Sequence, residues 1–121
     1  MEYMISVNKI DDVIKIAHER QAYYNTNIRV SNNLHLALQT YLRNLSFDEV
    51  KSLTSIMYLG KDKDYYRKLT PIQIYKSNFE YFDKTLTWFT KDLEIKQMVE
   101  KLQLAKYLTD GKLQPLHLKL L

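Results

Sequence analysis

The scarcity of glycine and proline is the feature that most constrains the fold of this chain. Two glycines and two prolines occur among its 121 residues, where average usage would give roughly eight and six. Tight β-hairpins and glycine-rich phosphate loops need such residues, so the sequence argues against both. Apolar residues make up 45% and charged residues 26% of the chain, which is typical of a folded domain. We therefore expect a single all-α domain spanning residues 1–121.

Three helices are expected before residue 61, because residues suited to one helical face recur there at intervals of three and four. Asn8 can cap the first helix, and Ser31–Asn33 supply the start signal of the second. Ser46 and Glu49 have the spacing of a capping box for the third, which should end at Gly60 in a left-handed conformation. The faces comprise Ile10, Val13, Ile14, Ala17, Gln21 and Tyr24; Leu34, Leu38, Tyr41, Leu42 and Leu45; and Val50, Leu53, Ile56 and Met57.

Two more helices are expected after a charged loop at 61–68. Thr70, Pro71 and Gln73 indicate the start of a long fourth helix, which we expect to be central in a compact bundle of about five helices. A last helix should begin near 90–92 and end at 110–111, followed by an apolar C-terminal segment docked on the body or on another chain. The faces comprise Ile72, Tyr75, Phe79, Phe82, Leu86 and Phe89; and Leu93, Ile95, Met98, Val99, Leu102, Ala105 and Leu108.

The fourth helix carries apolar residues on two sides, which leaves two interpretations open. Ile74, Tyr81 and Trp88 recur every seven positions, about 200° around the helix from the first series. Either this helix is buried on both sides, or the second series forms a ridge for another protein chain. Changing Trp88 to a polar residue would separate loss of stability from loss of association. The expected protein interface comprises Ile74, Tyr81, Trp88, Leu116, Leu118, Leu120 and Leu121.

Short motifs for catalysis or metal binding are lacking in the sequence. Cysteine is absent, which excludes disulfides, thiolate metal sites and cysteine nucleophiles. The histidines His18, His35 and His117 have no spacing that places two of them on one helical face, so we expect no metal site and no cofactor. His18 is expected at the edge of an apolar face rather than in a catalytic role. We therefore expect a protein that is not an enzyme.

Nucleic-acid binding is the alternative function. The formal net charge is +4, which favours weak attraction to polyanions. The second and third helices resemble a helix-turn-helix in spacing, but Asp48 and Glu49 would repel phosphates at the start of the recognition helix. A basic loop flanked by tyrosines at 58–68 is the better candidate, although its aspartates also suit a solvated turn. Its binding residues would be Lys61, Lys63, Tyr65, Tyr66, Arg67 and Lys68.

Two segments resemble a family of small uncharacterised bacterial domains. In that family an acidic-start helix ends in an aromatic residue, an aliphatic residue, glycine and a basic residue, as Tyr58–Lys61 does here, with Tyr58 where the family norm is tryptophan. The segment 104–113 is similar to the closing element of the family. The resemblance implies an all-helical domain and no assigned activity.

The sequence as a whole predicts a binding protein, in the manner of a bacterial or phage accessory factor acting by occlusion or scaffolding. Its expected partner is another protein or a second copy of the chain as a homodimer, with nucleic acid as the alternative. No stretch approaches the roughly 18 apolar residues of a membrane span, and Met1–Ile5 do not begin a signal peptide. We therefore expect a cytoplasmic location and no membrane partner.

Overall fold

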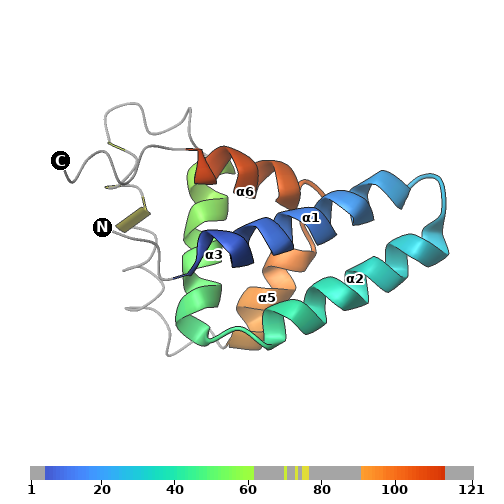
Figure 1. Ribbon diagram of the computed structural model, residues 1–121, viewed down its shortest axis with the longest axis horizontal. Coiled ribbons are helices and arrows are strands. Elements are labelled where there is room, and N and C mark those ends of the chain that lie inside the picture. The colour runs from blue at the N-terminus through green and yellow to red at the C-terminus, as the bar shows by residue number, and fades with distance from the viewer. Residues whose placement is uncertain (1–4, 62–69, 71–72, 74, 77–90, 114–121) are drawn as a thin grey trace.

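The computed structural model describes residues 5–61, 70, 73, 75–76 and 91–113. Within them it contains five α-helices and no strand, which confirms the prediction of an all-α bundle. Their labels are those of Figure 1. The helices are α1 (Val7–Tyr23), α2 (Ile28–Arg43), α3 (Phe47–Lys61), α5 (Lys91–Val99) and α6 (Leu104–Lys112).

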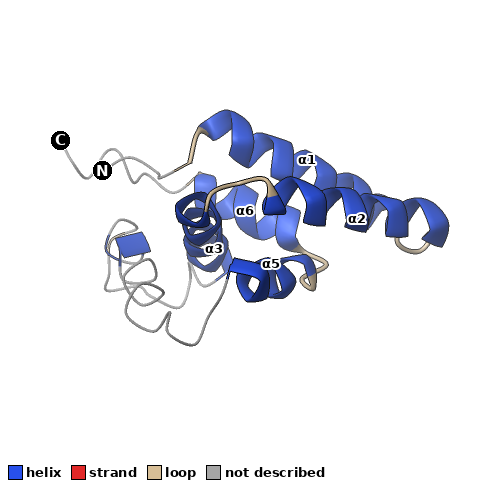
Figure 2. Ribbon diagram, turned by 90° about the horizontal axis from the view of Figure 1, so that it is seen from below, coloured by secondary structure: helices blue, strands red, loops and turns tan. Residues whose placement is uncertain are grey.

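Helix α3 packs against α6 and α5. Helices α1 and α2 form an antiparallel hairpin whose turn lies at the end of the molecule farthest from α3 (Figure 1). Helix α6 packs against both α3 and α1, while α5 lies between α2 and α3 (Figure 2). All residues of α3 from Val50 to Gly60 are buried except Tyr58, which is partly buried. Among the described helices α3 is therefore the most completely buried.

The first two helices begin earlier than their sequence signals predict. Ser6, not Asn8, caps α1, since its hydroxyl oxygen accepts a hydrogen bond from the Lys9 amide at 3.3 Å. Asn27 caps α2 by accepting from the Val30 amide at 3.2 Å. Ser31 lies inside α2 and is buried. A Ser or Asn one turn inside a helix is thus indistinguishable in sequence from a cap.

The predicted capping box of the third helix is confirmed. The Glu49 amide donates to the Ser46 hydroxyl at 3.1 Å, and the Ser46 amide donates to the Glu49 carboxylate at 2.9 Å. The second carboxylate oxygen of Glu49 pairs with Lys9 at 2.7 Å. The start of α3 is therefore fixed to α1 as well as capped.

The two glycines serve helix packing rather than helix termination. Neither has a positive φ, and α3 and α6 continue to Lys61 and Lys112. A Cβ atom on Gly60 would overlap the carbonyl oxygen of Tyr107, and one on Gly111 would overlap the carbonyl oxygen of Ile56. Each helix thus presents a glycine where the other backbone crosses it, and the prediction that Gly60 ends its helix in a left-handed conformation was wrong.

The expected last helix is divided into α5 and α6 by residues 100–103. In an uninterrupted helix the carbonyl of Val99 would accept from the amide of residue 103. It accepts instead from the guanidinium of Arg20, at 2.6 Å. The same group donates to the carbonyl of Lys101 at 2.9 Å. A side chain from α1 therefore satisfies the backbone at the end of α5, where the chain turns into α6.

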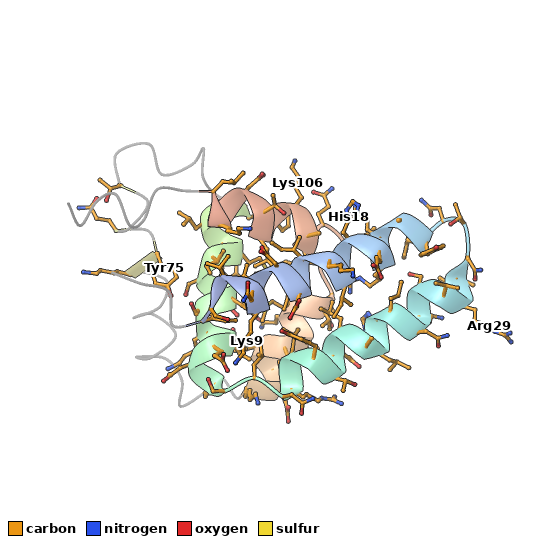
Figure 3. All side chains as sticks on the ribbon, viewed as in Figure 1. Lys9, His18, Arg29, Tyr75 and Lys106 are labelled. Atoms are coloured by element: carbon orange, nitrogen blue, oxygen red, sulfur yellow. The ribbon has the colours of Figure 1, made fainter. Side chains whose placement is uncertain are left out.

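The start of the expected fourth helix is only partly described. The amide of Gln73 donates to the Thr70 hydroxyl at 3.3 Å, and the amide of Thr70 donates to the Gln73 side-chain oxygen at 2.8 Å, as predicted for a capping box. Tyr75 is buried, and its hydroxyl is hydrogen-bonded to that of Ser52 on α3 at 2.6 Å (Figure 3). The remainder of that helix and the segment from residue 114 onward lie outside the described residues.

Candidate functional site

A cleft of about 220 Å³ lies where the α1–α2 hairpin meets the connection between α5 and α6. Helix α1 and its C-cap contribute one wall, α2 a second, and the end of α5 with the following turn a third. Segments nearly eighty residues apart in the chain thus form one site. The cleft is lined by Arg20, Tyr24, Ser31, Asn32, His35, Val99, Glu100 and Leu102.

Arg20 is the central polar group of the cleft wall. Its side chain is only 3% exposed, and burial lowers the pKa of its guanidinium. Besides the carbonyls of Val99 and Lys101, it contacts Nδ1 of His35 at 3.3 Å. Three of the five N–H groups of an arginine therefore have acceptors, and Nε has none within the described part of the chain. No carboxylate there pairs with this cation.

The contact with Arg20 fixes the state of His35. Because a guanidinium can only donate, Nδ1 of His35 must be the acceptor, so the neutral ring carries its proton on Nε2. Partial burial, followed by the positive charge of Arg20, lowers the pKa of His35. His35 is therefore a neutral ring with one nitrogen already engaged.

The rim of the cleft is apolar. Tyr24 is 48% exposed and Leu102 is 38% exposed, on opposite walls. Tyr23 and Ile28 are also exposed, on either side of the α1–α2 turn (Figure 1). Glu100, which lies between α5 and α6, is exposed and is the acidic residue that lines the cleft. Exposed aromatic residues are enriched at protein-binding surfaces relative to the rest of a protein surface, so Tyr24 makes this surface a candidate for protein binding.

Glu94 is a second buried charge, away from the cleft. Its side chain has no exposed surface, and neither carboxylate oxygen has a hydrogen-bond partner among the residues described. Burial raises the pKa of Glu94, and the Thr54 hydroxyl opposes this only in part. That hydroxyl already donates to the carbonyl of Val50 at 3.0 Å. Glu94 lies on α5, which packs against α2 and α3, so it belongs to the bundle interior.

Most of the sequence-predicted binding residues are not placed. The expected interface of Ile74, Tyr81, Trp88, Leu116, Leu118, Leu120 and Leu121 lies outside the described residues. Of the six proposed nucleic-acid-binding residues, only Lys61 is described; it is exposed, and its ammonium lies 5.8 Å from the ring centroid of Tyr58. Lys63, Tyr65, Tyr66, Arg67 and Lys68 are not described. Neither proposed surface is tested by the structure.

The remaining histidine predictions concern His18 and His117. His18 is exposed on α1 and points into solvent (Figure 3), while His117 lies outside the described residues. No group of three His, Asp or Glu side chains in the described ranges is arranged to hold a metal ion. None of the helices described is long and apolar enough to cross a membrane.

Arg20 is not among the predicted site residues, although its position in the sequence indicates that it is buried. The buried positions of α1 are Ile10, Val13, Ala17 and Arg20, which continue one three-and-four series. The predicted face continues instead through Gln21 and Tyr24, and both are exposed. An arginine in register with an apolar face indicates a buried cation whose donors need acceptors.

Comparison with known proteins adds no name to this site. No family model matches the chain, and no match is found among curated proteins or solved structures. The resemblance to a family of uncharacterised bacterial domains therefore stays a prediction. The function has to be argued from the cleft itself.

Proposed function

We propose that this protein is a non-enzymatic binding module that receives another protein at the cleft between the α1–α2 hairpin and the α5–α6 connection. The observation that carries the proposal is the composition of this surface. Exposed Tyr24 and Leu102 flank a cleft whose wall contains the buried cation of Arg20. Tyrosine and arginine are among the residue types most enriched at the energetic centre of protein interfaces, where they lie in desolvated pockets.

The groups in the cleft suit binding better than catalysis. A general base needs a free nitrogen or oxygen near the reacting proton and a pKa close to the working pH. Nδ1 of His35 is occupied by Arg20, and the pKa of His35 is lowered rather than raised. The Ser31 hydroxyl donates to the carbonyl of Arg20 at 3.2 Å and is buried. These groups hold each other in place, which favours a rigid receptor acting by occlusion or scaffolding.

Site-specific photo-crosslinking tests the proposal. A photoreactive phenylalanine analogue at position 102 should give protein adducts in extracts of the source cells. The control carries it at 106, an exposed position of α6 that does not line the cleft (Figure 3). Adducts specific to position 102 that contain a different protein support the proposal. Equal adducts at both positions, or no protein adduct, contradict it.

Self-association and nucleic acid are distinguished in the same experiment. An adduct at 102 with twice the mass of the chain, together with a dimer in light scattering, identifies a second copy as the partner. An adduct removed by nuclease contradicts protein binding at the cleft and supports the nucleic-acid alternative. The hydrophobic ridge that includes Trp88 stays a separate proposed surface, tested by whether Trp88→Gln abolishes association in light scattering without unfolding the monomer.

A further inference from the structure

We infer that the cleft binds the carboxylate of an aspartate or glutamate side chain presented by the partner protein, with Arg20 as the group that recognises its charge. This inference names the chemistry of the partner and rests on the proposed function. The inference concerns binding and includes no covalent step, so it requires only that the side chains of the cleft match the charge and shape of the ligand.

The charge of Arg20 is the first support. Burying a guanidinium is costly unless it is paired, and here its acceptors are two neutral carbonyls and a neutral imidazole. These acceptors replace water, and no carboxylate in the described part of the chain pairs with the cation. Because the surroundings of Arg20 are largely desolvated, an anion entering the cleft would interact with it more strongly than at an exposed arginine. Because the described residues supply no negative partner for Arg20, we expect the ligand to be an anion.

The other groups of the cleft narrow the ligand to a carboxylate. Among the described lining residues Arg20 is the one permanent cation, and Glu100 is the one carboxylate. One cation next to a carboxylate suits a singly charged anion and disfavours a phosphate, whose charge approaches two. The volume of about 220 Å³ accommodates a short side chain. Tyr24 and Leu102 can cover its methylene groups at the rim.

His35 provides a direct readout, because it touches the recognising group. In the free protein, burial and Arg20 lower the pKa of His35. A carboxylate bound in the cleft adds a negative charge near both side chains, which favours the imidazolium and raises the pKa of His35. The titratable and charged side chains that face the cleft are Arg20, Tyr24, His35 and Glu100, from all three of its walls. His18, exposed on α1, serves as the internal reference.

The experiment is an NMR titration of the histidine side chains of the full-length protein. The probe is glutamate blocked at both ends as N-acetyl-glutamate N-methylamide, and the control probe is the corresponding blocked glutamine. Acetate is the third probe, because it carries the carboxylate charge but lacks the rest of the glutamate side chain. We expect blocked glutamate to raise the pKa of His35 and leave His18 unchanged, with a weaker effect of acetate and none of blocked glutamine.

Replacing Arg20 would also leave the carbonyls at the end of α5 without their hydrogen-bond donor, which could disturb the fold. The two variants of this experiment therefore change other residues and keep Arg20. Glu100→Gln removes the like charge in the cleft and should tighten blocked glutamate binding about fivefold. Asp92→Asn is the matched control, because it removes an exposed negative charge about 12 Å away along α5. It should leave the affinity unchanged.

The failures of the two proposals are distinguishable. An equal response to blocked glutamate and blocked glutamine, or no response of His35, overturns the carboxylate assignment even if crosslinking at 102 succeeds. Acetate binding as tightly as blocked glutamate overturns the assignment to a protein side chain. Equal effects of Glu100→Gln and Asp92→Asn overturn the placement in the cleft. A selective response to blocked glutamate without crosslinked protein would instead refute the proposed function.

Discussion

Replacing Gly60 by alanine tests the close crossing of α3 and α6. The added Cβ would lie 2.5 Å from the amide nitrogen of Gly111 and 2.9 Å from the carbonyl carbon of Tyr107, whereas ordinary contacts begin at 3.4 Å. These neighbours are backbone atoms, so rotation of a side chain cannot relieve the overlap. The two helices must separate by about 1 Å or more along the interface between α3 and α6.

Two opposing terms set the size of the effect. Alanine is better than glycine inside a helix by about 1 kcal/mol, which would stabilise an exposed position. Overpacking a close helix contact costs about 3 kcal/mol when backbones have to move. We therefore expect Gly60→Ala to lower the free energy of unfolding by about 2 kcal/mol, which corresponds to about 8 °C in Tm for a chain of this length.

Urea unfolding and thermal melts followed by circular dichroism measure this loss. Thr109→Ala is the control, because Thr109 is exposed on α6 and gains helix propensity without meeting a neighbouring backbone. It should match or slightly exceed the wild-type stability. A Gly60→Ala protein as stable as the control would refute the close crossing and restore Gly60 as an ordinary helix-end residue.

Three further features of the fold are tested by substitution, each by urea unfolding. Glu94→Met should raise the free energy of unfolding by about 1–3 kcal/mol at pH 7, because it removes a buried carboxyl that has no hydrogen-bond partner among the described residues. The pKa of Glu94 is raised in the fold, so wild-type stability should fall as pH rises above the ordinary value of 4.5, and a slope unchanged in the variant contradicts this. Tyr75→Phe should lower stability by about 1–2 kcal/mol because it leaves the buried Ser52 hydroxyl without its partner, and a neutral result would argue against that hydrogen bond. Ser6→Ala should lower stability by about 1 kcal/mol and Asn8→Ala by less, whereas the reverse order would return the cap to Asn8.

Local signals in the sequence predicted the helices and two of their starts. The boxes at Ser46 and Thr70 depend on residues three positions apart, so no tertiary information is needed to recognise them. The buried faces of α2 and α3 likewise follow the expected spacing at Leu38, Leu42 and Leu53. What the sequence could not give is the choice between a helix end and a helix crossing at Gly60, because that choice depends on the backbone of α6.

The break between α5 and α6 also depends on a residue that is distant in the sequence. Residues 100–103 are Glu, Lys, Leu and Gln, all good helix formers, so local propensity predicts continuation. The helix stops there because the Val99 carbonyl has an alternative donor in Arg20, which is 79 positions earlier in the chain. No window of sequence around the break contains that donor.

Arg20 accounts for both the departure from the predicted fold and the candidate site. Its donors end α5 and turn the chain toward α6, and this turn places Glu100 and Leu102 opposite the α1–α2 hairpin. Without the turn, a continuous helix would leave α2 with no third wall facing His35. The cation is buried where it stabilises this connection, and its acceptors among the described residues are all neutral. The same interaction that shapes the backbone therefore creates a cleft with a positive charge in its wall.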